Sequence, residues 1–316
     1  MAPHLAGSLK KLIIIAGPTA VGKSDLAVRC AGYLRDSCGV ESGIINADSV
    51  QLYDELKILT AYPSDESLAR VEHYLYGVLS PRKTSSVNFW LDSAGEKIRQ
   101  LNRENKVAIV CGGTGLYIGA LMNGISAVPS IPTDFRSKVQ EKFQQMGRDA
   151  FFDLLQTLDP DLCKTLHKNN TQRILRAYEV VSHTGKPLSV WWKEGERRKD
   201  VDDEEIFSVV LLPPRENINE RCMRRIKKMM EGGAVGEVGQ FIEKYPMYNG
   251  PLGKVIGYRE ILSLLDGKIS VSDCMQLMFI KTKQYAKRQS VWFRHQMKAT
   301  MVIANFGHEV EIFFKN

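Results

Sequence analysis

Unbroken apolar runs alternate with helix-like patterns along the first third of the chain. The runs lie within residues 11–17, 42–49 and 106–115, and helical periodicity follows the first and the third, over about 24–36 and 116–124. Strands that are apolar on both faces are typical of a parallel sheet covered by helices. The pattern therefore predicts an α/β fold, with ligands bound at the carboxyl ends of the strands.

The pattern changes at about residue 128. A proline-rich turn, VPSIPTDFR, leads into a series of helical patterns, and the charged stretch KEGERRKDVDDEE follows them. The next run, IFSVVLLPP, has the character of a strand, and most of the remaining chain has helical periodicity. We predict a first part of the sheet domain over residues 1–127, a helical insert over 128–205, and a second part over 206–316 that ends in basic helices.

The composition is typical of a soluble globular protein. The chain has 316 residues, of which 44% are hydrophobic and 25% charged, and no apolar run approaches the roughly 20 residues of a membrane span. The short apolar segment near the N-terminus favours a strand over a signal peptide. Six scattered cysteines predict neither a zinc site nor a disulfide framework. We expect a cytoplasmic protein, and a monomer because no long heptad pattern is present.

Positive charge is concentrated near the end of the chain. The net charge is +7, and residues 274–308 contain no acidic residue. Within this stretch the segment KTKQYAKRQSVWFRHQMK interleaves basic and aromatic side chains. Such a mixture suits a nucleic acid, whose phosphates attract cations and whose bases stack on rings. A solvated amphipathic helix would have a similar pattern, so the segment alone leaves both interpretations open.

The segment after the first strand has the spacing G-x-x-x-x-G-K-S of a phosphate-binding loop. In such a loop the backbone N–H groups and the positive end of the following helix face phosphate oxygens. A lysine adds charge, and the hydroxyl that follows it is a ligand for Mg²⁺ held by the phosphates. The loop consists of Gly17, Pro18, Thr19, Ala20, Val21, Gly22, Lys23 and Ser24, and Ser24 is the predicted metal ligand.

Other parts of a nucleotide hydrolase are missing from the sequence. Hydrolases place an Asp at the end of a second apolar strand to help hold magnesium, but the obvious strand here, VAIVCGG, ends in glycine. The chain also lacks an Asn-Lys-x-Asp segment for guanine. These absences favour a transferase in which the loop holds a leaving diphosphate.

Asp48 follows the second predicted strand, at the same edge of the sheet as the loop. A carboxylate at this place can accept a proton from an incoming nucleophile. An isolated Asp in such a position is more often a turn residue or a helix cap, but the adjacent phosphate loop favours the catalytic interpretation. Ser49 and Gln51 add hydrogen-bonding groups, and a Gln side chain can pair with adenine in bidentate fashion.

Six sequence motifs occur in a fixed order between about Lys11 and Arg294. They are GPTAVGKS, INADSVQLYD, GGTGLYI, QRILRAYEV with TGKP, IGYREI and QYAKRQSVWFR. By these motifs the chain resembles the tRNA dimethylallyltransferases, also called tRNA isopentenyltransferases. The resemblance implies a P-loop NTPase-like parallel sheet with a helical insert domain. It also implies transfer of a dimethylallyl group from dimethylallyl diphosphate, assisted by Mg²⁺, to N6 of the adenosine 3′ to the anticodon in tRNAs that read U-starting codons.

The resemblance also implies roles for individual residues. Lys23, Ser24 with Mg²⁺ and the loop amides would stabilise the leaving diphosphate, Thr19 would donate to its bridging oxygen, and Asp48 would accept the N6 proton. Thr114 would face the tRNA near the reactive base. The other predicted tRNA contacts are Asp48, Ser49, Val50 and Gln51 at the adenosine, Arg136 at the start of the insert, and Gln172, Arg173, Ile174, Leu175 and Arg176 at the anticodon loop.

Two arginines are predicted from their position alone. Arg215 and Arg221 follow the strand IFSVVLLPP, so we expect them to reach the diphosphate. The chain departs from the family pattern at Tyr62, where lysine is common, at Gly77, where Asp is common, and at Lys283, where Arg is common. These departures concern tRNA contacts rather than the proposed chemistry. No Cys/His pair follows the last helix, so we expect a bacterial-type enzyme without a zinc finger.

Three alternatives differ in substrate or in class. An isopentenyltransferase acting on free adenine nucleotide would not need the insert or the basic C-terminal helix. A small-molecule kinase could use Asp48 to activate a hydroxyl group. An RNA-binding module that uses a bound nucleotide as a switch would bind tRNA without forming a covalent product.

Overall fold

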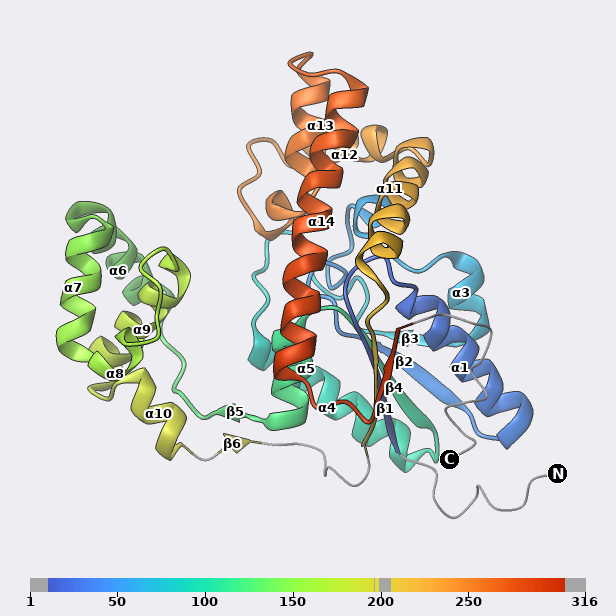
Figure 1. Ribbon diagram of the computed structural model, residues 1–316, viewed down its shortest axis with the longest axis horizontal. Coiled ribbons are helices and arrows are strands. Elements are labelled where there is room, and N and C mark those ends of the chain that lie inside the picture. The colour runs from blue at the N-terminus through green and yellow to red at the C-terminus, as the bar shows by residue number, and fades with distance from the viewer. Residues whose placement is uncertain (1–10, 196, 199–205, 305–316) are drawn as a thin grey trace. The chain divides into compact units, whose positions relative to one another are not determined.

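The computed structural model describes residues 11–195, 197–198 and 206–304. Its contacts divide the chain into two compact units (Figure 1). The sheet unit comprises residues 1–122 and 200–316, and the insert unit comprises residues 123–199. The charged stretch that the sequence analysis places before residue 206 lies partly outside the described residues.

The sheet unit is built around a six-stranded sheet in which every pair of neighbouring strands is parallel. The strand order is β3-β2-β4-β1-β7-β8. All residues of β1, β2 and β4 are buried, as expected for central strands covered on both faces. The strands are β1 (Leu12–Ala16), β2 (Ser42–Asn46), β3 (Glu72–Tyr74), β4 (Val107–Gly112), β7 (Ile206–Leu211) and β8 (Met301–Ile303).

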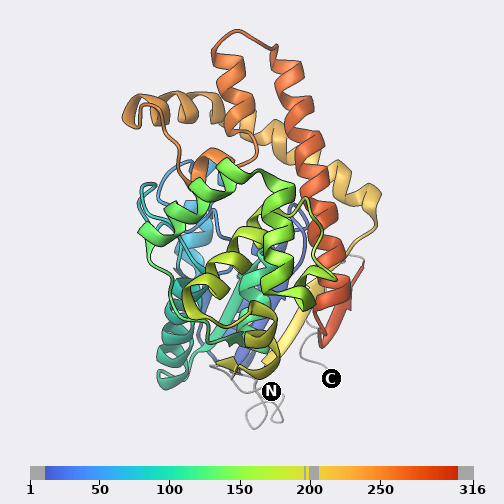
Figure 2. The same cartoon turned by 90° about the vertical axis from the view of Figure 1, so that its left-hand side faces the viewer.

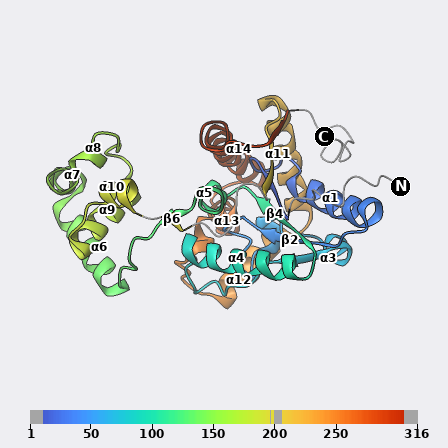
Figure 3. The same cartoon turned by 90° about the horizontal axis from the view of Figure 1, so that it is seen from below.

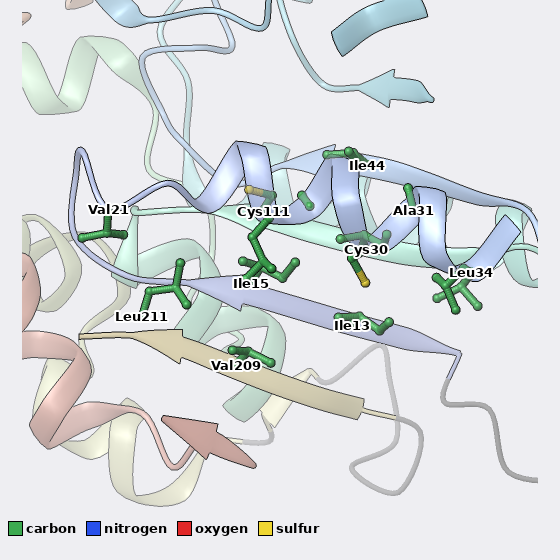
Figure 4. Packing of buried hydrophobic residues seen from close by; sticks show 14 of the residues in the cluster. Ile13, Ile15, Val21, Cys30, Ala31, Leu34, Ile44, Cys111, Val209 and Leu211 are labelled. Carbon is green, nitrogen blue, oxygen red and sulfur yellow. The ribbon is translucent and has the colours of Figure 1, made fainter. Parts of the chain in front are cut away.

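Helices connect these strands and cover them. One hydrophobic cluster joins α1 to one face of the sheet, where Ile15, Cys111 and Leu211 from three strands meet Cys30 and Leu34 of the helix (Figure 4). The helices of this unit are α1 (Lys23–Cys38), α2 (Lys57–Thr60), α3 (Asp65–Arg70), α4 (Val87–Arg103), α5 (Gly115–Asn123), α11 (Arg215–Glu231), α12 (Ala234–Lys244), α13 (Tyr258–Leu265) and α14 (Val271–Gln296), with a 3₁₀ turn, η2, at Pro251–Lys254.

Two of these helices, α11 and α14, pack against each other and run side by side (Figures 1 and 3). The basic and aromatic segment near the end of the chain belongs to α14, which is one continuous helix of 26 residues. Ser270 and Asp273 begin this helix with reciprocal hydrogen bonds, a capping box. None of the helices among the described residues is both long and apolar enough to cross a membrane.

The insert unit is a small helical bundle with its own core, seen from a second direction in Figure 2. Phe151, Leu155, Ile174 and Val180 are fully buried in it. Buried Asp159 accepts hydrogen bonds from the backbone N–H groups of Leu162 and Ser189, which ties two helices together. The elements are β5 (Ile125–Ser126), α6 (Thr133–Met146), α7 (Arg148–Leu158), α8 (Pro160–Cys163), α9 (Thr171–Thr184), α10 (Leu188–Glu194) and β6 (Arg197–Arg198), and β5 pairs antiparallel with β6.

The predicted α/β class is confirmed, and the differences lie in short or amphipathic elements. The edge strands β3 and β8 have three residues each, too few for a period to be visible. Helix α8 has only four residues, Pro160–Cys163, so this part of the predicted helical series forms only one turn. Helix α4 was not predicted, although Ser86 caps it and Trp90, Leu91, Ala94 and Ile98 form its buried stripe.

Candidate active site

The phosphate loop connects β1 to α1 by a tight turn that requires glycine at both ends. Gly17 has φ +150°, and a Cβ atom at this position would lie 2.6 Å from the carbonyl oxygen of Leu211 in β7. Gly22 has φ +92° and precedes the first residue of α1. Between them Ala20 has φ +64°, which is uncommon for a residue with a side chain. The loop thus leads directly into the N-terminus of a 16-residue helix.

Lys23 folds back over the loop, and its Nζ donates to the carbonyl oxygen of Pro18 at 2.7 Å. Burial lowers the pKa of this amine, while the charges of Cys111 and Asp48 oppose that shift and Arg225 adds to it. Ser24, the next residue, is exposed in the first turn of α1. Its side chain also forms a hydrogen bond with buried Cys111.

Gln289 of α14 joins the phosphate loop to the loop after β4. Its Oε1 accepts from the backbone N–H of Thr19 at 2.8 Å, and its Nε2 donates to the carbonyl oxygen of Gly113 at 2.8 Å. The side chain is 7% exposed. These two bonds fix which end of the amide faces which loop, because only Oε1 accepts and only Nε2 donates.

Asp48 lies at the end of β2 in a turn held by neighbouring polar groups. The amide of buried Asn46 accepts from the N–H of Asp48 at 2.7 Å and donates to its carbonyl oxygen at 2.9 Å. Asp48 Oδ1 accepts from the N–H of Val50 at 3.2 Å. Thr114 contacts the same turn, because its Oγ1 accepts from the N–H of Ser49 at 3.0 Å. The structure therefore brings the predicted Asp48, Ser49, Val50 and Thr114 together.

The side chain of Gln51 contacts the segment around α2. Its Nε2 donates to the carbonyl oxygens of Thr60 and Ala61, at 3.1 and 2.7 Å. Bidentate pairing with adenine uses this amide nitrogen as the donor, and here both of its hydrogens are engaged within the protein. Gln51 therefore also holds the segment around α2 in place, and its contact with adenine stays a prediction.

Helix α11 places arginines along the phosphate loop. Arg221 Nη1 donates to the carbonyl oxygen of Val21 at 3.2 Å. One turn later, Arg225 Nη1 donates to Thr19 Oγ1 at 2.9 Å. Arg215, by contrast, is exposed at the first residue of the helix and does not line the cavity described below. Arg215 was predicted to reach the diphosphate because it closely follows a strand. The helix face that a residue occupies indicates such a contact better than its distance along the chain from the strand.

Arg225 was missed by the sequence analysis, although its spacing from Arg221 gave a signal. Residues four apart share one face of a helix, so a contact by Arg221 implies one by Arg225. Burial lowers the pKa of the Arg225 guanidinium, and the charge of Asp48 opposes that shift. This arginine, Lys23 and Asp48 thus form one charged cluster next to Thr19.

A cavity of about 300 Å³ opens beside this cluster, entirely within the sheet unit. Its polar lining includes Thr19, Asp48, Arg225 and Arg288. The other lining is mostly apolar and comes from α2, α11, α14 and the segment before α13, including Leu59, Met229, Val255, Ile256 and Met278. The cavity therefore combines cations and a phosphate loop with an apolar compartment.

The predicted contacts on the insert unit divide into exposed and buried residues. Gln172 and Arg173 are exposed in the first turn of α9, and Arg136 and Arg176 both lie near Glu179, at 3.8 and 3.6 Å. Ile174 is fully buried in the core of the unit, and Leu175 packs against that core. The Ile174 side chain is fully buried and holds the helix in place, so it does not face a ligand, whereas the contact of partly buried Leu175 stays a prediction.

A parallel α/β sheet with a phosphate loop after its β1 strand defines the P-loop class of proteins. Within this class, a family model described as IPP transferase matches residues 51–296. The chain belongs to the IPP transferase family, whose members are prenyltransferase enzymes.

Several relatives are similar over most of their length. The tRNA dimethylallyltransferase of Chelativorans sp. (strain BNC1) is 39% identical over 92% of this chain and 97% of its own. That of Pelagibacter ubique (strain HTCC1062) is 36% identical over 91% of this chain and 89% of its own.

Solved structures show the same similarity. The full-length tRNA isopentenylpyrophosphate transferase from Bacillus halodurans superposes with a TM-score of 0.66 at 27% identity, covering 96% of this chain and 94% of that one. A eukaryotic dimethylallyltransferase acting on tRNA superposes with a TM-score of 0.75 at 27% identity, covering 90% of this chain and 70% of that one.

Proposed function

We propose that this protein transfers a dimethylallyl group from dimethylallyl diphosphate to N6 of the adenosine 3′ to the anticodon in tRNAs that read U-starting codons. The observation that carries the proposal is the two-part cavity. A prenyl diphosphate is a short hydrocarbon joined to a polyanion, and the cavity has an apolar compartment beside a phosphate loop and arginines. The names of the relatives support the same reaction.

The diphosphate binds at the phosphate loop with its charge facing Lys23 and Arg225. As the bond between the allylic carbon and the bridging oxygen breaks, negative charge grows on the leaving group, and preorganised cations stabilise it. Thr19 Oγ1 accepts a hydrogen bond from Arg225, so its own proton remains available for the bridging oxygen. The new bond joins the allylic carbon to N6, and Asp48 accepts the proton that N6 loses.

Magnesium fits this site as an ion shared with the substrate. The described residues contain no group of three or more His, Cys, Asp or Glu side chains that could hold a metal. Mg²⁺ commonly keeps several waters and takes phosphate oxygens as ligands, so the hydroxyl of Ser24 is the one ligand that the protein would supply. When bound, the ion neutralises part of the charge on the leaving diphosphate.

Exposed cations on α14 and on the insert unit hold the nucleic acid. Helix α14 carries exposed Lys287 and Arg288, and Arg288 also lines the cavity. Arg173 on the insert unit is exposed as well. The target base enters by leaving the stack of the anticodon loop, which costs less in a single-stranded loop than in a duplex.

A labelling experiment tests the proposal directly. Purified protein is incubated with labelled dimethylallyl diphosphate, Mg²⁺ and either an anticodon stem-loop with the target adenosine or free AMP. We expect label on the RNA alone, and none when guanosine replaces the adenosine. Label on AMP alone would indicate a nucleotide isopentenyltransferase. No label on either, with ATP consumed in a parallel assay, would indicate a kinase or a nucleotide-dependent switch.

A further inference from the structure

The cavity extends along two helices, α11 and α14, that each contact the phosphate loop through one part of their length. On α14, Gln289 contacts Thr19, and Met278 lines the cavity about 16 Å away along the helix axis. On α11, Arg221 contacts Val21, and Met229 lines the cavity about 12 Å further along. On both helices the lining residue farthest from the loop is a methionine, Met229 or Met278, so we take this apolar part as the far end of the cavity.

This far end is closed by three groups in close contact. Leu59 and Met278 are 3% and 1% exposed. A Cβ atom added to Gly257 would lie 2.5 Å from Leu59 Cδ1 and 2.8 Å from Met278 Cε, so only a glycine backbone fits against both side chains. Gly257 has φ +102°, which also favours glycine. Leu59, Met278 and Gly257 are therefore in close contact at this wall, and no Cβ atom fits between them.

Two carboxylates outside the cavity keep this wall in position. Glu237 of α12 accepts from the N–H groups of Ile58 and Leu59, at 2.8 and 3.0 Å. Glu260 of α13 accepts from the N–H of Gly257 at 2.8 Å and forms an ion pair with Lys281 of α14. Both segments that close the cavity are thus anchored through their backbones, and the wall does not yield easily to a longer ligand.

We propose that Leu59 and Met278, packed against Gly257, limit the prenyl chain to a single five-carbon unit. The proposal rests on the proposed function, since it assigns the apolar compartment to the hydrocarbon of the donor. A ten-carbon donor such as geranyl diphosphate has the same diphosphate and the same reactive carbon. Its second isoprene unit would have to occupy the space of the wall.

The test compares two donors with one acceptor, the anticodon stem-loop. Wild-type protein, Leu59→Ala and Met278→Ala are assayed with dimethylallyl diphosphate and with geranyl diphosphate. We expect wild type to use the first donor only. In each variant we expect the ratio of kcat/KM for the ten-carbon over the five-carbon donor to rise about tenfold or more, the scale on which pockets discriminate added carbons.

Control variants show whether a change in the donor ratio comes from the wall or from a general loosening of the core. Leu101→Ala removes an equally buried leucine of α4 that does not line the cavity, and it is expected to leave the ratio unchanged. Circular dichroism reports whether each variant is folded. If Leu59→Ala does not fold, Leu59→Val makes a smaller change and is expected to raise the ratio less.

The outcomes also separate this proposal from the proposed function. If wild type transfers neither donor, the proposed function itself fails. If wild type transfers the five-carbon group and the folded variants leave the donor ratio unchanged, the wall does not set chain length. Equal use of both donors by wild type would overturn the proposal without any variant.

Discussion

At the scale of single residues, the proposed reaction needs a base for the N6 proton and donors for the leaving diphosphate. Asp48 is the acidic residue in the cavity lining, and it shares that lining with Thr19 and Arg225. Its turn is held by Asn46, whose own carbonyl oxygen accepts from Trp90 Nε1 at 2.6 Å. The carboxylate is therefore preorganised, with no need to move when a base arrives.

Asp48→Asn is expected to lower kcat about 100-fold or more, because the amide cannot accept the N6 proton as a carboxylate does. Asn keeps an oxygen for the N–H of Val50, so the turn and the affinity for the stem-loop should remain. Turnover and RNA binding are measured separately, with exposed Asp54→Asn as the matched control. Near-normal turnover of Asp48→Asn would remove the residue from this role.

The two departures from the family pattern, Tyr62 and Gly77, contact each other. A Cβ atom on Gly77 would lie 3.0 Å from the Tyr62 hydroxyl oxygen, and Gly77 has φ +61°. Lys57 Nζ lies 5.0 Å from the centre of the Tyr62 ring. Because the two positions are this close, we expect substitutions at one of them to depend on the residue at the other.

Gly77→Asp alone is expected to lower the free energy of unfolding by about 1 kcal/mol or more, because of crowding and the positive φ. Combined with Tyr62→Lys, part of this loss should be recovered, giving a coupling free energy of about 0.5 kcal/mol or more. Urea unfolding of wild type, both single variants and the double variant measures the coupling. Strictly additive changes would show that the two positions are independent.

At the scale of elements, α14 connects the phosphate loop with the loop that follows β4. Gln289 connects Thr19 in the phosphate loop with Gly113, next to Thr114. Trp292, one turn away, packs so closely on α5 that a Cβ atom on Gly115 would lie 2.5 Å from its ring. The helix thus fixes both loops against each other.

Gln289→Leu removes both hydrogen bonds and leaves a buried N–H and a buried carbonyl without this partner. We expect affinity for inorganic pyrophosphate to fall about tenfold or more, and kcat to fall with it. Pyrophosphate binding is measured by calorimetry, with exposed Gln284→Leu on the same helix as control. Unchanged pyrophosphate affinity in a folded Gln289→Leu variant would show that the phosphate loop holds its shape without α14.

At the scale of the whole molecule, both units carry exposed positive charge. The formal net charge is +7. Exposed Lys287 belongs to the sheet unit and exposed Arg173 to the insert unit. Phosphate contacts release counterions, so their number is measured by the salt dependence of binding.

Lys287→Ala and Arg173→Ala are each expected to weaken stem-loop binding and to lower the slope of log affinity against log salt by about 1. Neither should change pyrophosphate affinity. Exposed Arg99→Ala on α4 is the control. Binding is measured at several salt concentrations, and a slope that equals that of wild type would exclude the residue from phosphate contact.

Local features of this protein could be read from the sequence. The phosphate loop, the central strands and the position of Asp48 at a strand end depend on short segments, where spacing and apolar runs determine the conformation. The insert was recognisable for the same reason, since its helices have their own periodicity. The hydrogen-bond partners of Gln51 and the burial of Ile174 could not be predicted from the sequence. The residue type in a motif does not show whether the side chain faces a ligand or the protein core.

The rest of the site depended on the tertiary structure. Arg225 meets Thr19 from 206 residues away, and Gln289 meets the same residue from 270 residues away. Glu237 reaches Leu59 across 178 residues. No local period encodes such contacts, because they depend on how α11, α12 and α14 dock on the sheet. The sequence by itself thus determined that a phosphate loop and a strand-end carboxylate lie at one edge, and only the packing of distant helices decided which cations and which apolar wall surround them.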